Sequence, residues 1–198
     1  LSETTEFIGA EDILVKRAAT PEVRQRILDI LGRYEEHFLR CGENVRLGNP
    51  TPGNIAGGLT TLEEKSLGCI HKGGESIIQA VYDYAKPIPV EQKGLVIMDT
   101  PGNDASSMAG MAAGGAQVCV FSSGHGTPIG CPLMPVIKIT GNRETARLME
   151  DNIDFDASPA LTGEKTIDQL AGDLHALLVD TASGRETKAE LLGYTETA

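Results

Sequence analysis

Residues 94–104 read Gly-Leu-Val-Ile-Met-Asp-Thr-Pro-Gly-Asn-Asp, and this stretch decides the fold. Its apolar residues form one short continuous run, which is typical of a strand buried on both faces of a parallel sheet. The run ends in Asp99, a turn follows, and the small, Ala- and Gly-rich residues 106–115 suit a helix packed closely on a sheet. The stretch therefore predicts one strand–turn–helix step of an α/β fold.

Further strands are predicted at 117–122 and 136–140, followed by helices at 143–150 and 166–182. Strands that alternate with helices favour right-handed crossovers. We therefore predict an α/β fold, with a mainly parallel sheet and helices on both of its faces. The fold is Rossmann-like but lacks the dinucleotide fingerprint, because no Gly-x-Gly-x-x-Gly follows the first strand.

The N-terminal half is predicted to be helical around a Gly-rich loop. Helices are expected over 9–19 and from Pro21 to Gly42, and an irregular loop of prolines and glycines covers 49–58. A capping box at Thr61 predicts a helix that ends around Gly68.

A further amphipathic helix is expected at 75–85. We divide the chain into a helical and Gly-rich-loop portion, 1–90, and an α/β portion, 91–198, within one continuous domain. The opening Leu-Ser-Glu-Thr resembles a strand end, which is expected of the C-terminal part of a longer chain.

Composition narrows the class of protein. The 198 residues carry a formal net charge of −11 and 40% hydrophobic residues, and no apolar run approaches the roughly 20 residues of a membrane span. The acidity argues against nucleic-acid and membrane-surface binding. The four cysteines show no zinc spacing, so we expect a reduced, cytoplasmic protein.

Ligands of parallel sheets collect beyond the carboxyl ends of the strands. Asp99 and Asp104 lie on either side of the turn at one such strand end. Both are candidate metal-binding carboxylates, and Asp104 is alternatively an acidic residue favoured in the first turn of a helix. His125 lies between two glycines at another end, either as a proton-transfer group or as an ordinary loop histidine. Lys65 follows the Gly-rich loop and can pair with a substrate carboxylate, whereas Glu64 suits capping.

Several motifs occur together in a fixed order. They are Leu1-Ser-Glu-Thr-x-Glu6-x-x-Gly9-Ala-Glu11, Asn49-Pro-x-Pro-Gly-Asn54-x-x-Gly-Gly58, Leu62-Glu-Glu-Lys-Ser-Leu-Gly68, Pro101-Gly-Asn-Asp104, Phe121-Ser-x-Gly-x-Gly126, Met149-Glu-Asp-Asn-Ile-Asp154 and Ala182-Ser-Gly184. Over nearly the whole chain they resemble the galactarate/altronate dehydratase family. His125 stands where that family commonly has an arginine.

The resemblance implies a hydro-lyase that converts a hexaric or hexonic acid to a 2-keto-3-deoxy sugar acid with the help of a divalent metal, typically iron(II). It also implies that upstream domains of the same polypeptide are needed and that this region is C-terminal. We further expect a homo-oligomer whose partner is a small sugar acid.

This chemistry removes a proton beside a carboxylate and expels a neighbouring hydroxyl, so it needs a base, an acid and stabilisation of negative charge. We predict that the Gly-rich loop and the two strand-end loops form one polar pocket. The predicted proton-transfer residues are His125 and Lys65, and the predicted metal ligands are Asp99, Asp104 and Glu63. The predicted substrate-binding residues are Asn49, Asn54, Gly57, Gly58, Ser66, Asn103, Ser122, Ser123 and Thr127.

Two alternatives remain beside the dehydratase. One is a lyase of the same family with another leaving group, such as sulfite from sulfolactate. The other is a structural or oligomerisation domain without activity when isolated. A nucleotide-binding module is a more distant alternative, because its fingerprint is missing.

Overall fold

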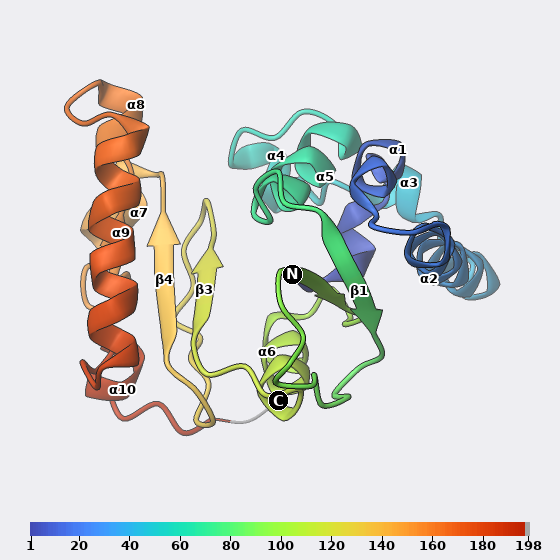
Figure 1. Ribbon diagram of the computed structural model, residues 1–198. Coiled ribbons are helices and arrows are strands. Elements are labelled where there is room, and N and C mark those ends of the chain that lie inside the picture. The colour runs from blue at the N-terminus through green and yellow to red at the C-terminus, as the bar shows by residue number, and fades with distance from the viewer. Residues whose placement is uncertain (197–198) are drawn as a thin grey trace. The chain divides into compact units, whose positions relative to one another are not determined.

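The computed structural model describes residues 1–196 and divides the chain into two compact units, 1–114 and 115–198. The predicted α/β class is confirmed, because every named strand pairs in parallel and helices surround the strands (Figure 1). The strands form two small sheets, one in each unit.

The sheet of the first unit consists of β1 (Ile78–Tyr82) and β2 (Leu95–Met98). On one edge of β2, the Asp99 amide donates to the Tyr82 carbonyl at 2.8 Å. On the other edge, the Leu1 nitrogen donates to Val96 O and the Met98 amide donates to Leu1 O, each at 2.9 Å. The opening residues of the chain thus extend the ladder beyond β2.

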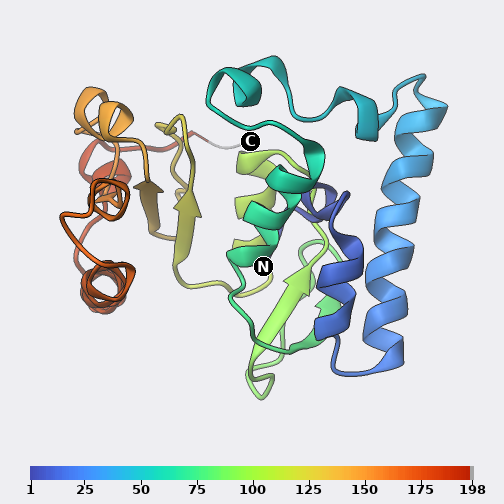
Figure 2. The same ribbon diagram turned by 90° about the horizontal axis from the view of Figure 1, so that it is seen from above.

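The long helix α2 (Pro21–Arg40) matches its predicted bounds. Thr20 caps its N-terminus, and Gly42, at φ 82°, follows the C-cap residue Cys41. Its predicted apolar stripe is buried at Ile27, Ile30 and Leu31. Figures 1 and 2 place α2 and α6 (Asp104–Ala113) on opposite sides of the β1–β2 sheet.

Several short helical elements lie before and after α2 in the first unit. The 3₁₀ turn η1 (Thr4–Phe7) precedes α1 (Glu11–Leu14) and η2 (Val15–Arg17), which replace the single helix expected at 9–19. After α3 (Val45–Gly48), the loop that was expected to be irregular contains the short helix α4 (Pro52–Ala56). Its cap is the Thr51 hydroxyl, which accepts from the Asn54 amide.

Helix α5 (Leu62–His71) begins where predicted and continues three residues past Gly68. The Thr61 hydroxyl accepts from the Glu64 amide at 3.2 Å. The Glu64 carboxylate accepts hydrogen bonds from the amide and hydroxyl of Thr60, so it does not complete the predicted capping box with the Thr61 amide. The helix continues because Cys69 and Ile70 are buried in the core, and this packing outweighs the low helix propensity of glycine.

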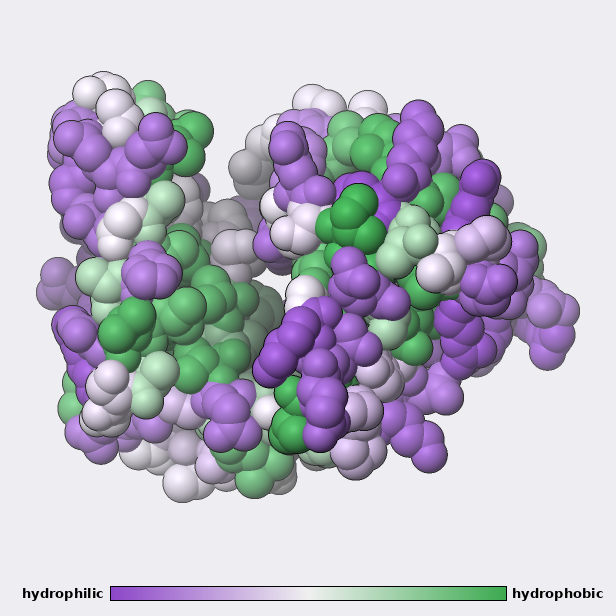
Figure 3. Space-filling view, viewed as in Figure 1, coloured by the Kyte–Doolittle hydropathy of each residue, from purple (hydrophilic) through white to green (hydrophobic). Residues whose placement is uncertain are grey.

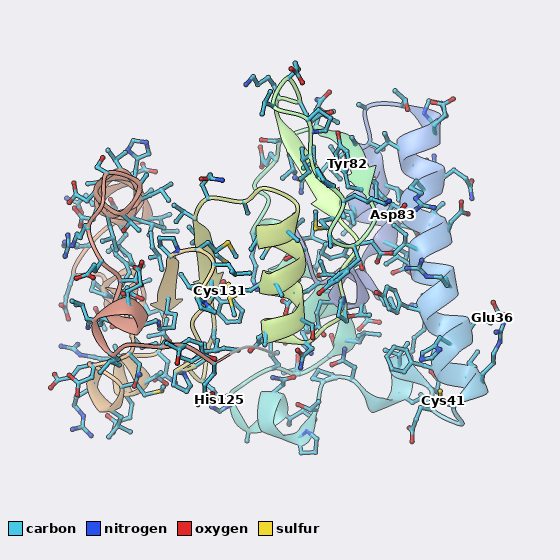
Figure 4. The ribbon with its side chains drawn as sticks, turned by 90° about the horizontal axis from the view of Figure 1, so that it is seen from below. Glu36, Cys41, Tyr82, Asp83, His125 and Cys131 are labelled. Atoms are coloured by element: carbon cyan, nitrogen blue, oxygen red, sulfur yellow. The ribbon has the colours of Figure 1, made fainter. Side chains whose placement is uncertain are left out.

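The helix predicted at 75–85 is wrong, because the structure forms β1 there. Ile78, Val81 and Tyr82 are β-branched or aromatic, and such residues fit a pleated strand better than a helix. The parallel pairing of Ile78 with Leu95 and of Tyr82 with Met98 decides the outcome. At the end of this strand, Asp83 pairs with Arg26 of α2; Figure 4 labels Tyr82 and Asp83 beside that helix.

The second unit confirms the strands and helices predicted for it. Its sheet has the order β3 (Cys119–Ser122), β4 (Val136–Thr140), β5 (Phe155–Asp156). The helices are α7 (Arg143–Leu148), α8 (Pro159–Thr162), α9 (Ile167–Ala182) and α10 (Lys188–Leu191). Helix α9 runs alongside β4 in Figure 1.

Strand β4 contains a buried charge. Lys138 is 1% exposed, and its ammonium lies 3.6 Å from the Asp154 carboxylate. The two oxygens of Asp154 also accept the amides of Lys138 at 2.8 Å and Lys188 at 2.7 Å. One carboxylate thus ties β4 to the start of α10.

The surface of the second unit also contains apolar residues. Large side chains such as Val120, Leu133 and Leu191 are exposed, and Figure 3 shows apolar colour over part of this unit. Over residues 1–196, no helix combines the length and apolar character that crossing a membrane requires.

Candidate functional site

The carboxyl end of β2 carries a buried carboxylate, as the sequence predicts for a strand end. Asp99 is 5% exposed, and its Oδ1 accepts the Thr4 hydroxyl at 2.8 Å. Its other oxygen pairs with the Arg33 guanidinium of α2. Asp99 therefore joins the opening segment, β2 and α2, and both of its oxygens are occupied.

Glu3 lies beside this strand end in an unusual backbone conformation. Its φ and ψ are 60° and 57°, in the left-handed region that non-glycine residues rarely adopt. The Glu3 amide donates to the Thr100 hydroxyl at 2.7 Å, and that hydroxyl is 2.8 Å from the hydroxyl of Ser107 in α6. These contacts hold the Glu3 backbone where β2 ends and α6 begins.

The Glu3 carboxyl has a strongly altered acidity. Burial raises its pKa to about 7, and the nearby carboxylates of Asp104 and Glu6 add to this rise, whereas the Lys72 ammonium opposes it. A hydrogen bond with the Asp104 side chain also raises the pKa. A carboxyl group with a pKa near 7 is able both to accept and to donate a proton at neutral pH.

One face of α5 complements these carboxylates. Lys65 Nζ lies 2.8 Å from Glu6 Oε2 and donates to Asn49 Oδ1 at 2.9 Å. Cys69 and Lys72 follow at helical spacing on the same face. Burial raises the pKa of the Cys69 thiol to about 11, which keeps it protonated beside the charges of Glu3, Glu6 and the two lysines.

We call Glu3, Glu6, Lys65, Lys72 and Asp104 the Glu3 cluster. All five belong to the first unit, and they come from η1 and its cap, α5 and its cap, and α6. The two ammonium groups are suited to an anionic substrate, and the Glu3 carboxyl is suited to proton transfer.

The remaining predicted substrate-binding residues of the first unit are placed in structural roles or on the surface. Ser66 is buried and donates to the Ile8 carbonyl. Asn103 caps α6 by accepting from the Ser106 amide at 3.0 Å, and Asn54 accepts the Thr51 hydroxyl at 3.0 Å. Gly57 and Gly58 are exposed and follow α4. The structure thus joins Lys65 to Asn49 but gives capping roles to Asn54 and Asn103.

Ser122 is the last residue of β3 in the second unit, and the loop that follows holds Ser123, His125 and Thr127. His125 is exposed, and Figure 4 labels it in that unit. The Ser123 amide donates to Ile139 O at 3.0 Å, and the Thr127 hydroxyl accepts from the Ile129 amide at 3.2 Å. The joining of this loop with the first unit in one pocket stays a prediction.

The predicted metal ligands do not form a set that fits a divalent metal. Both oxygens of Asp99 have partners, and Glu63 is exposed in the first turn of α5. Within residues 1–196, no group of three or more His, Cys, Asp or Glu side chains is arranged to hold a metal ion. We therefore derive no step through a metal, and iron(II) binding stays a prediction for the full-length protein.

Sequence reasoning did not assign a role to Glu3, Glu6 or Lys72. A signal was present, because Glu3 and Glu6 lie in the Leu-Ser-Glu-Thr-x-Glu motif, and Lys72 falls at helical spacing from Lys65. What the sequence does not show is that the two segments meet.

Comparison with known proteins gives one consistent result. The family model described as D-galactarate/altronate dehydratase, C-terminal, matches residues 1–198. An altronate dehydratase of Bacillus subtilis is 35% identical over 198 residues, which is all of this chain and 39% of that protein.

Two other relatives are named for different activities. A galactarate dehydratase (L-threo-forming) of Escherichia coli is 37% identical over 186 residues, covering 93% of this chain and 35% of its own. The beta subunit of a (2R)-sulfolactate sulfo-lyase of Chromohalobacter salexigens is 38% identical over 196 residues, covering 98% of this chain and 50% of its own. The chain therefore spans half or less of the length of each of these relatives.

Proposed function

The chain belongs to the D-galactarate/altronate dehydratase family, whose C-terminal model it matches over its whole length, and from this we propose that the protein containing it is a hydro-lyase of sugar acids. The reaction expels water from a hexaric or hexonic acid and leaves a 2-keto-3-deoxy acid. The family match carries this proposal. The Glu3 cluster supports it, because it combines cationic groups with a proton-transfer group.

A sugar acid offers two kinds of group to such a site. Its carboxylate suits the ammonium of Lys65, which already lies between an acidic partner and the amide of Asn49. Its hydroxyls suit short polar side chains and exposed backbone, such as those of Asn54 and the Gly57–Gly58 turn. Lys65 thus serves as a carboxylate anchor or, as the sequence also suggests, as a proton-transfer residue.

His125 is the second proposed proton-transfer residue. It belongs to the strand-end loop of the second unit, with Ser122, Ser123 and Thr127 as further polar contacts. In the full-length protein, His125→Ala is expected to lose most turnover while remaining folded. Unchanged turnover would remove His125 from the chemistry.

The test is a substrate screen of the full-length protein. Purified protein is assayed with galactarate and with altronate, in parallel samples with and without added iron(II), and keto-acid formation is measured. Keto acid from either substrate supports the proposal. Failure with both, under conditions in which the protein is folded, contradicts it. The isolated residues 1–198 are assayed alongside, because full activity is expected to need the rest of the polypeptide.

A sulfite-releasing lyase is the second candidate, and the similarity to the sulfolactate sulfo-lyase subunit favours it. The two reactions begin with the same removal of a proton beside a carboxylate and differ in the leaving group. Release of sulfite from sulfolactate, with no keto acid formed from either sugar acid, would select this candidate.

A further inference from the structure

We propose that the open edge of β3 receives a further parallel strand, contributed by the polypeptide that precedes residue 1 in the full-length protein. This inference goes beyond the proposed function, because it concerns how the second unit is completed and not which reaction the protein performs. It is carried by the hydrogen-bond pattern of β3, by the uncharged sequence around it and by the length of the relatives.

Strand β3 is bonded to a neighbouring strand on one edge. It lies at the end of the sheet order β3, β4, β5. The Cys119 amide donates to the Pro135 carbonyl at 2.9 Å, and the Ser123 amide donates to β4 at 3.0 Å. Because backbone groups of alternate residues point to the same edge of a strand, those of Val120 and Ser122 point to the opposite edge. No strand within residues 1–196 pairs with that edge.

The open edge lacks the features that normally keep such an edge from pairing. Natural edge strands are protected by charged side chains, by proline or by bulges. The sequence of β3 is Cys-Val-Phe-Ser, and its register with β4 is continuous. In addition, no Asp, Glu, Lys or Arg occurs from Ala105 to Ile137, although 23% of the whole chain is charged. The sequence around this edge is therefore suited to burial.

Apolar side chains are exposed in the same uncharged stretch. Val120 of β3 is 45% exposed, and Leu133, just before β4, is 70% exposed. Figure 3, in the view of Figure 1, shows apolar colour where β3 and β4 lie. Neighbouring strands lie about 4.7–4.9 Å apart, so a strand added at this edge would cover part of Val120 and bond the outward backbone groups at the same time.

The occupant that fits this edge is the rest of the same polypeptide. The matching family model is described as C-terminal, and the matched region covers 39% of the altronate dehydratase of Bacillus subtilis and 50% of the sulfo-lyase subunit. Half or more of each relative therefore lies outside the region that corresponds to this chain. Every named strand pair of this chain is parallel, and a strand that joins β3 in the same direction continues that pattern.

A second copy of this chain fits the edge less well. A two-fold axis perpendicular to the sheet would pair β3 with its own copy in the antiparallel direction and would make the sheet mixed. Each copy would also bring a formal net charge of −11, and like charge of this size opposes association.

The first measurement is hydrogen exchange of the full-length protein, resolved to single amides within 118–123. The Val120 and Ser122 amides are expected to exchange at least about 100-fold more slowly than unstructured amides. The Cys119 and Ser123 amides, which bond to β4, are the internal control. Fast exchange of Val120 and Ser122 beside a protected Cys119 and Ser123 would show an open edge and overturn the proposal.

The second measurement identifies the occupant. The photoreactive residue benzoylphenylalanine replaces Val120 in the full-length protein, and the same probe at Leu161, an 81% exposed residue of α8, is the matched control. Isotope-labelled and unlabelled protein are mixed and irradiated, and the cross-linked peptides are identified by mass spectrometry. The probe at Val120 is expected to cross-link to a peptide that precedes residue 1 in the same copy, and the probe at Leu161 is not.

Every other result counts against the added strand. A cross-link between labelled and unlabelled protein would identify a second copy as the occupant, and a cross-link confined to residues 1–198, or none, would also overturn the proposal. If the Val120 variant does not fold, the probe is placed at Gln117, an exposed residue just before β3, and the same outcomes apply. None of these readouts depends on lyase activity, so the proposed function is tested separately.

Discussion

Lys138 and Asp154 form a buried ion pair, and we predict that replacing one or the other has unequal effects on the free energy of unfolding. At 3.6 Å and an effective dielectric constant of about 20, the attraction is about 4–5 kcal/mol. Removing two ions from water costs several kcal/mol each. Lys138 Nζ has no hydrogen-bond partner among the described residues, whereas Asp154 accepts two backbone amides. Desolvation is the largest cause acting on Lys138 and lowers its pKa from 10.5.

The two single substitutions should therefore differ. Lys138→Met removes an ammonium that has no hydrogen-bond partner among the described residues and leaves the Asp154 carboxylate bound to two backbone amides, so we expect only a small loss in the free energy of unfolding, up to about 2 kcal/mol. Asp154→Asn leaves a buried ammonium without its counter-ion and weakens the acceptor of two amides, so we expect a loss of about 3–5 kcal/mol.

The pH dependence has a definite sign. Between the lowered pKa of folded Lys138 and the unfolded value of 10.5, the unfolded chain holds the proton and the folded chain does not. Stability from this group therefore rises with pH across that window, and Lys138→Met should remove the rise.

The measurement is urea unfolding followed by far-UV circular dichroism at pH 7 and pH 10. Because the chain contains no tryptophan and two units, hydrogen exchange of peptides covering 136–140 assigns the change to the second unit. A loss above about 2 kcal/mol for Lys138→Met, or equal losses for the two variants, would refute the reasoning.

Three further predictions concern the first unit and are checked by urea unfolding. Asp99→Asn should lower the free energy of unfolding by about 2–3 kcal/mol, because the buried carboxylate loses charge-assisted hydrogen bonds. Arg33→Met should lower it by less than about 1 kcal/mol, because the arginine side chain is half exposed. Equal losses for the two variants would contradict this reasoning. Gly102→Ala should lower the free energy of unfolding by about 1–3 kcal/mol, because the added Cβ would collide with the Thr5 hydroxyl. An unchanged urea midpoint would show that the turn shifts to accommodate the Cβ. Thr61→Ala should cost about 0.5–2 kcal/mol through the lost cap of α5, and no loss would mean that Glu64 and Thr60 cap the helix without it.

Local sequence signals predicted most elements of the fold. The Thr20 cap with Pro21 located α2, and the apolar runs before Asp99 and over 136–140 located β2 and β4, because these signals act within a few residues. The segment around Ile78 was assigned to a helix. The spacing of its apolar residues fits both the helical and the strand periodicity, and only the pairing of Ile78 with Leu95 selects the strand.

The candidate site was predicted in part. The strand-end rule located Asp99 and Asp104, and the Gly-rich loop drew attention to Lys65 and Asn49, which do contact each other. Glu3 was not assigned, because its partner Thr100 is 97 residues away and no local pattern encodes that contact. A metal site was expected from the resemblance, and the donor set in this region does not fit it.

The pairing of Leu1 with β2 has a consequence for synthesis on the ribosome. Leu1 and Val96 are 95 residues apart, so at about 5–20 residues per second the opening segment waits about 5–20 s before its partner is made. During that time its backbone donors and acceptors have no ladder to join. A nascent chain arrested before Val96 should leave residues 1–4 open to proteases and chaperones, whereas a chain released after β2 has emerged should protect them.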